Sequence, residues 1–98
     1  MKREDVLRTL RDHREKLRRF RVASLWIFGS VARDDATDAS DIDVLVEFEE
    51  GQRVGLFTFI RLMHYLEDLL GAKVDLATPG ALRPEMRDEV LGEAIRAT

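Results

Sequence analysis

The feature that most constrains the fold is an acidic segment with an apolar strand pattern inside it. Residues 34–50 hold eight acidic side chains and no basic one, and they contain the apolar strand pattern Ile42, Val44, Leu45 and Val46. An apolar strand of this kind has to be buried, so neighbouring carboxylates must fold close together. Two unit charges about 5 Å apart repel by roughly 3 kcal/mol at an effective dielectric near 20. Because a small domain is stable by only about 5–15 kcal/mol, the segment predicts a bound cation or protonation that offsets the repulsion.

Strand alternation places two of these acids on one face. Successive side chains of a strand point to opposite faces, so Asp41 and Asp43 share a face and lie about 7 Å apart. Asp75 is a third candidate, because it interrupts the apolar pair Val74 and Leu76, where an unpaired acid is costly. If the two strands are neighbours, the three carboxylates can hold a hard cation through oxygen. The alternative is that one or more of these acids faces solvent at a sheet edge.

A second candidate feature is the Gly29-Ser30 pair, which follows an apolar run ending at Phe28. Glycine lets the backbone approach a ligand closely, and the amides of a following helical turn, with a serine hydroxyl, can bind phosphate. The alternative is an ordinary helix-capping serine after a turn glycine. The spacing to Asp41 and Asp43 favours the first interpretation, since a phosphate cradle beside a metal site is what phosphoryl or nucleotidyl transfer requires.

The remaining periodicity predicts the order of the elements. It indicates a helix over 4–20, a strand over 22–28, a short helical turn and polar loop over 30–40, a strand over 41–48, a helix over 56–70, a strand over 73–78 and a last helix that begins at Pro84. The helix over 56–70 is expected to bury Leu56, Phe59, Ile60, Met63, Leu66 and Leu70, and the last helix Met86, Val90, Leu91, Ala94 and Ile95. The order of helices and strands predicts an α+β fold.

Length and composition limit the class of protein. The 98 residues suit one domain over 1–98. The absence of cysteine excludes disulfides and thiol catalysis and fits a reducing cytoplasm. No apolar run is long enough for a membrane span, and no secretory signal is expected at the N-terminus. We therefore expect a cytoplasmic protein that does not insert into a membrane.

Three motifs together resemble a known family, the minimal nucleotidyltransferases of the DNA-polymerase-beta superfamily, and in particular the antitoxins that pair with HEPN-domain toxins. The resemblance covers about residues 20–98. The motifs are Gly29-Ser30-x-Ala32-Arg33-x-Asp35-Ala36, Ser40-Asp41-Ile42-Asp43 and Val74-Asp75-Leu76. One position departs from the pattern, because Asp34 stands where the family usually has glycine; aspartate tolerates the left-handed backbone better than most residues.

The resemblance implies a fold and an activity. The fold is a small mixed sheet of about three strands flanked by helices, and the substrate is a nucleoside triphosphate with Mg²⁺ in a two-metal site. Position by position, Gly29 and Ser30 would hold the triphosphate, Asp41 and Asp43 would bind metal, and Asp75 would be a further metal ligand or the general base. Arg33 is a candidate for neutralising phosphate. The reaction would be transfer of AMP from ATP to a tyrosine of a HEPN-type toxin.

Two other functions stay open from the sequence. A non-catalytic antitoxin would neutralise its partner by contact alone, which fits the small size and the apolar helix faces. A nucleic-acid-binding module would use the N-terminal part, because residues 1–33 carry a balance of six positive charges. No aromatic side chains alternate with these basic residues, so direct nucleic-acid binding is not expected, and a solvated helix or a docking face for an acidic partner is favoured. The sequence leaves a homodimer or a hetero-oligomer equally open.

Overall fold

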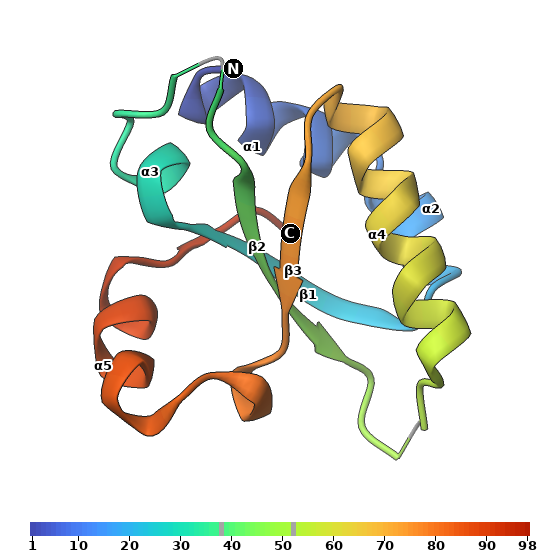
Figure 1. Cartoon of the computed structure of the whole chain (residues 1–98). Helices are drawn as coiled ribbons and strands as arrows, with labels where there is room; N and C mark the ends of the chain where they lie inside the picture. Colours follow the sequence, from blue (N-terminus) through green and yellow to red (C-terminus); the bar gives the residue numbers. More distant parts are fainter. Residues whose placement is uncertain (38, 52) are drawn as a thin grey trace.

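The structure, a computed structural model, describes residues 1–37, 39–51 and 53–98, so Asp38 of the acidic segment lies outside the described residues. Its strands form one four-stranded sheet, and its helices pack around that sheet (Figure 1). The helices are α1 (Arg3–Asp12), α2 (Arg14–Arg18), α3 (Gly29–Ala32), α4 (Leu56–Leu70) and α5 (Pro84–Glu93), with a 3₁₀ turn η1 (Pro79–Ala81). The strands are β1 (Val22–Phe28), β2 (Ile42–Phe48), β3 (Val74–Ala77) and β4 (Ile95–Arg96).

The sheet is mixed, as the family resemblance implies, and its strand order is β3-β2-β1-β4. Strand β1 pairs antiparallel with β2 and with β4, whereas β2 and β3 run parallel. The expected count of about three strands is one too low, because β4 pairs with β1 through only Ile95 and Arg96. Two residues are too few to show a strand periodicity, so this pairing has no signal in the sequence.

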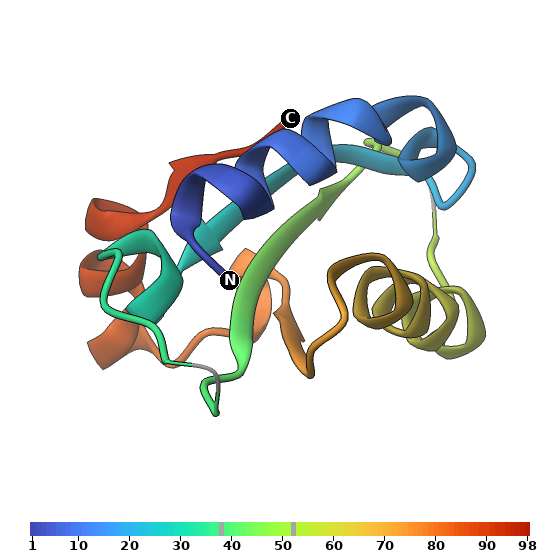
Figure 2. The same cartoon turned by 90° about the horizontal axis from the view of Figure 1, so that it is seen from above.

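The main core lies on one face of the sheet. Alternate side chains of β2, namely Ile42, Val44 and Val46, are buried there against α1, α2 and α4. The intervening residues of the same strand, Asp43 among them, point to the opposite face. Figure 2 shows α1 and α2 lying along one side of the sheet, with α4 and α5 at opposite ends of the molecule. The opposite face of the sheet, which carries Asp43, is therefore covered by η1 and α5.

The first helix differs from the expectation of one helix over 4–20. It breaks at His13, which lies between α1 and α2. The His13 amide bonds to the Leu10 carbonyl oxygen, while the His13 ring donates its Nδ1–H to the Thr9 carbonyl oxygen 2.8 Å away. The ring therefore satisfies the carbonyl that the His13 amide would bond in a continuous helix.

The apolar faces of two helices are also narrower than expected. Leu56 is 70% exposed at the start of α4, although Leu66 and Leu70 of the same helix are buried. In α5 only Val90 is buried, and Met86 and Leu91 are each 48% exposed. The helix ends at Glu93 because Ala94 turns to an extended conformation and Ile95 pairs with Ile27, residues that periodicity alone assigned to the helix. No helix within the described ranges is both long and apolar enough to cross a membrane.

Candidate functional site

Two of the predicted acidic residues are direct neighbours across the parallel strands. Asp43 of β2 lies opposite Asp75 of β3 in the register, so both side chains belong to the same face of the sheet. Asp41 lies just before β2, is exposed, and has the same parity as Asp43. The structure therefore brings Asp43 and Asp75 together from segments that are distant in the sequence, with Asp41 beside them.

The predicted bend lies directly against Asp43. Gly29 follows Phe28, the residue of β1 that pairs with Asp43, and it begins α3 with a φ of 70°. A Cβ at this position would collide with the Asp43 carboxylate. Glycine is thus required twice, because L side chains rarely adopt a left-handed backbone and because the carboxylate fills the space. Ser30, the second residue of α3, is half-buried, and its carbonyl oxygen accepts the Asp35 amide at 3.0 Å.

The electrostatics of the site converge on Asp43, whose pKa is raised to about 6. Burial is the largest cause, and the charges of Asp75 and then Asp41 add to it. The positive charge of Arg33 opposes the shift. Burial and like charges both disfavour the ionised form of a carboxylate. The carboxylates of Asp43, Asp75 and Asp41 therefore repel one another in the folded protein, as the acidic segment predicts, and a cation bound at this face would reduce that repulsion.

Arg33 lies at the same site and is held by two acids. Its Nη1 donates to Glu93 Oε2 at 3.1 Å, and its Nε donates to Asp35 Oδ2 at 3.4 Å. These hydrogen bonds, with that to Glu93 the larger cause, raise the pKa of the guanidinium further above its ordinary value. Arg33 is exposed, so its charge remains accessible at the rim of the site.

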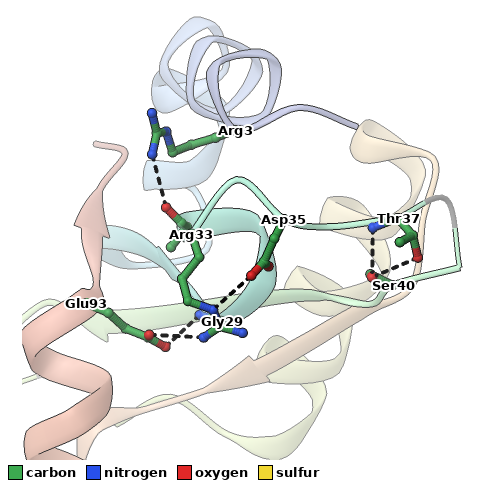
Figure 3. Close-up of polar contacts among 8 residues, drawn as sticks. Arg3, Gly29, Arg33, Asp35, Thr37, Ser40 and Glu93 are labelled. Atoms are coloured by element: carbon green, nitrogen blue, oxygen red, sulfur yellow. Dashed lines mark hydrogen bonds and ion pairs between the residues drawn. The ribbon is translucent and has the colours of Figure 1, made fainter.

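Glu93 is a residue of the site that sequence reasoning missed. Figure 3 shows its side chain reaching from the end of α5 toward Gly29 and Arg33. One carboxylate oxygen accepts the Gly29 amide at 3.0 Å, and the other accepts Arg33 at 3.1 Å. Gly29 and Glu93 are 64 residues apart. No motif marked Glu93, because an acid at the end of a helix has no distinctive spacing.

Asp34, the departure from the family pattern, takes the left-handed backbone that its position requires. Its φ is 61°, and Arg21 is the one other non-glycine residue with positive φ among the described residues. The Asp34 side chain also accepts the Arg3 amide at 3.3 Å. The turn after α3 is therefore kept without glycine, as expected from the tolerance of aspartate for this conformation.

A cavity of about 290 Å³ opens between the sheet and α5 at this site. Gly29, Arg33, Asp43 and Asp75 line one side of it, and α5 contributes the other side, including Glu93. A larger cavity of about 540 Å³ lies at the start of α4, but its lining is mostly apolar and contains no acid or base. The smaller cavity is the better functional candidate because it joins perturbed titratable groups to a close backbone approach.

The cavity unites four of the six predicted site residues. Asp41 and Ser30 lie beside it and do not line it. Over the described ranges of the chain, no three acidic or histidine side chains are grouped as a ligand set for one metal ion. Asp43 and Asp75 therefore form a carboxylate pair, with Asp41 as an exposed neighbour. Carboxylate oxygens are the ligands that Mg²⁺ prefers, so the donor set fits that ion.

Sequence comparison identifies relatives over most of the chain. Residues 10–97 match the family described as nucleotidyltransferase domain. The chain is 41% identical over 93 residues to the protein adenylyltransferase MntA of Thermococcus cleftensis, which covers 94% of this chain and 92% of that protein. It is 48% identical over 75 residues to MJ0128 of Methanocaldococcus jannaschii, assigned as a protein adenylyltransferase, covering 76% of this chain and 74% of that protein.

Solved structures agree with this comparison. A structure assigned as a minimal nucleotidyltransferase superimposes with a TM-score of 0.78 at 43% identity, covering 97% of this chain and 95% of that one. A toxin–antitoxin structure with AMP-PNP has a TM-score of 0.68 at 18% identity, covering all of this chain and 73% of that one. At so low an identity the second match shows a shared fold alone.

Proposed function

Because the chain belongs to the nucleotidyltransferase family and is an enzyme of that class, we propose that it transfers AMP from ATP to a side chain of a partner protein. The observation that carries this proposal is the pairing of Asp43 with Asp75 directly over the Gly29 bend. A carboxylate pair beside a glycine that admits a close backbone approach suits a reaction in which the protein mainly positions phosphates and neutralises charge.

Mg²⁺ fits the acidic face of the site. Asp43 and Asp75 would be its ligands, with Asp41 completing a two-metal site. The raised pKa of Asp43 supports this assignment, because burial and then the charges of Asp75 and Asp41 destabilise its ionised carboxylate, and a bound cation would offset both effects. Bound Mg²⁺ would neutralise charge on the phosphates and activate the attacking oxygen. Asp75 is the exposed member of the pair and would be a metal ligand or the general base.

The other side of the site suits a triphosphate. Ser30 supplies a hydroxyl at the start of α3, and Arg33 supplies a positive charge at the rim of the cavity. Gly29 sets the start of α3 directly against the Asp43 carboxylate. In the reaction, the acceptor oxygen would form a bond to the α-phosphorus of ATP while the bond to the bridging oxygen breaks. Pyrophosphate would leave, and the proton of the acceptor would pass to a carboxylate or to water.

The partner would be a HEPN-type toxin, and the acceptor one of its tyrosines. The name of the Thermococcus relative, protein adenylyltransferase MntA, supports a protein acceptor. The named toxin–antitoxin structures that share the fold make a toxin the natural partner to test. The chain would act as one domain in the cytoplasm, without binding nucleic acid directly.

The test is to incubate the purified chain with ATP, Mg²⁺ and the protein encoded beside it, and to weigh both proteins by mass spectrometry. A gain of one AMP on the partner, mapped to a tyrosine, is expected. Asp43→Asn should abolish the transfer, whereas Glu47→Gln should not, although Glu47 is an exposed acid on the same strand. Transfer at the wild-type rate by Asp43→Asn would refute the metal assignment.

A non-catalytic antitoxin is the second candidate, and exposed apolar side chains favour it. Leu56 is 70% and Phe57 is 81% exposed at the start of α4, remote from the acidic pair. Exposed large apolar side chains that lie together are typical of protein–protein contact. Here toxin neutralisation would persist in the Asp41→Asn/Asp43→Asn double variant and would be lost in Phe57→Ser. The opposite pattern would favour catalysis.

A further inference from the structure

Glu93 connects α5 to two residues of the site, at the start of α3 and just after its end. Its Oε1 accepts the Gly29 amide at 3.0 Å, and its Oε2 accepts the Arg33 Nη1 at 3.1 Å. Both atoms of the carboxylate are therefore engaged, and the side chain is only 24% exposed. Charge-assisted hydrogen bonds of this kind are stronger than neutral ones. The end of α5 is thus tied to the beginning and to the end of α3.

The position of Gly29 affects the acid above it. The Asp43 carboxylate packs so closely over Gly29 that a Cβ could not fit between them. A shift of the Gly29 backbone would therefore move the surface on which Asp43 rests. Glu93 fixes that backbone by its amide, so the placement of Asp43 depends on a residue 50 positions later in the sequence, on another element.

Arg33 gains a defined position from the same carboxylate. An exposed arginine loses side-chain entropy when it is held in one conformation, and a second contact shares that cost. Arg33 has two such contacts, with Glu93 and with Asp35. Its guanidinium is therefore held at the rim of the cavity that also contains Asp43 and Asp75.

We propose that Glu93 is a positioning residue of the nucleotide site, where it holds the Gly29 backbone and the Arg33 side chain in the geometry that receives the triphosphate. This inference rests on the proposed function, since it assumes that Gly29 and Arg33 face the nucleotide. Glu93 acts through these two residues and is not itself a ligand of the phosphates.

Because Glu93 is negatively charged, its effect on nucleotide affinity has to be distinguished from simple competition with the phosphates. The two roles predict opposite changes in affinity when Glu93 is replaced. If Glu93 were an obstacle that occupies the donors needed by the phosphates, its removal would strengthen nucleotide binding. If it positions those donors, removal of its oxygens weakens binding. Glutamine separates the two contacts, because its amide oxygen can still accept the Gly29 amide, whereas its NH₂ group cannot accept the Arg33 Nη1–H.

The experiment compares Glu93→Ala and Glu93→Gln with the wild type. Asp88→Ala is the matched control, because Asp88 is an exposed acid of α5 that does not line the cavity, and no hydrogen bond to Gly29 or Arg33 is found for it among the described residues. Glu93→Met retains the length of the side chain without a carboxylate and serves if the alanine variant folds poorly. The binding of Mg·ATP is measured by calorimetry.

We expect Glu93→Ala to weaken Mg·ATP binding by about threefold to tenfold, the effect of one or two lost hydrogen bonds. Glu93→Gln, which keeps the Gly29 contact and loses the Arg33 contact, should weaken binding less than Glu93→Ala does, and Asp88→Ala should bind within about twofold of the wild type. Equal affinities for all variants, or tighter binding by Glu93→Ala and Glu93→Gln, would overturn the inference.

A second measurement separates failure of this inference from failure of the proposed function. Hydrogen exchange of the Gly29 amide, followed by NMR without nucleotide, should be about tenfold faster in Glu93→Ala and unchanged in Asp88→Ala. If the wild type does not bind Mg·ATP but Gly29 exchange behaves in this way, the assignment of Gly29 and Arg33 to the nucleotide site fails. The positioning of the Gly29 backbone by Glu93 is then still supported. An unchanged exchange rate of the Gly29 amide in Glu93→Ala would directly refute the positioning of Gly29 by Glu93.

Discussion

Replacing Asp43 by asparagine should stabilise the metal-free protein at neutral pH. The pKa of Asp43 is raised from its ordinary 3.8 to about 6, by burial and by the charges of Asp75 and Asp41. One pKa unit corresponds to about 1.4 kcal/mol, so the shift would amount to about 3 kcal/mol without solvent screening. Asp43 is only half-buried, and screening reduces the expected gain to about 1–2 kcal/mol. For a domain of this size the melting temperature should rise by about 5–10 °C.

The gain should depend on pH with a definite sign. Because the pKa of Asp43 is higher in the folded protein, the folded state binds the proton more tightly than the unfolded chain does. The contribution of the Asp43 proton to folding stability is therefore complete below the pKa of the unfolded chain. It is lost as the pH rises through the folded pKa of about 6. The difference between Asp43→Asn and the wild type should accordingly be largest at about pH 7.5 and vanish at about pH 3.5.

Thermal melts in EDTA at several pH values measure this directly, with Glu47→Gln as the control for loss of an exposed acid on the same strand. Adding Mg²⁺ should raise the melting temperature of the wild type and leave that of Asp43→Asn nearly unchanged, since the variant lacks one carboxylate of the Asp43–Asp75 pair. The reasoning is refuted if Asp43→Asn is no more stable than wild type at neutral pH. A gain of equal size at acidic and neutral pH would refute it as well.

Five further substitutions, which make three predictions, test the local geometry by chemical denaturation. Gly29→Ala should cost about 2–3 kcal/mol and Gly71→Ala about 1 kcal/mol, since both have positive φ and only Gly29 is crowded by Asp43; equal costs would contradict this. Asp34→Gly should change stability by less than about 0.5 kcal/mol, because relief of the left-handed backbone offsets the lost Arg3 contact; a cost above about 1 kcal/mol would contradict this. Leu66→Ala should lose about 3 kcal/mol and Leu56→Ala less than about 0.5 kcal/mol, and similar losses would show that burial is misassigned.

Local patterns were sufficient for most of the elements. Strand β1 has the bounds expected from its apolar run, and the four apolar residues of the predicted β2 pattern, Ile42, Val44, Leu45 and Val46, are all buried. Helix α4 ends at Gly71, whose φ of 66° and bond to the Glu67 carbonyl oxygen are those of a glycine C-cap. These features depend on side-chain periodicity and backbone preference, which short windows of sequence contain. The roles of the site residues in binding metal and nucleotide remain predictions.

Tertiary structure decided what short windows cannot contain. The pairing of Ile95 with Ile27 overrode the helical periodicity of the last helix and added β4. The register that sets Asp43 beside Asp75, and the hydrogen bond from the Gly29 amide to Glu93, join segments that are distant in the sequence. Such contacts depend on how strands align and on where a helix ends in space. The sequence by itself therefore determined the chemical groups, and only the packed fold decided which of them meet.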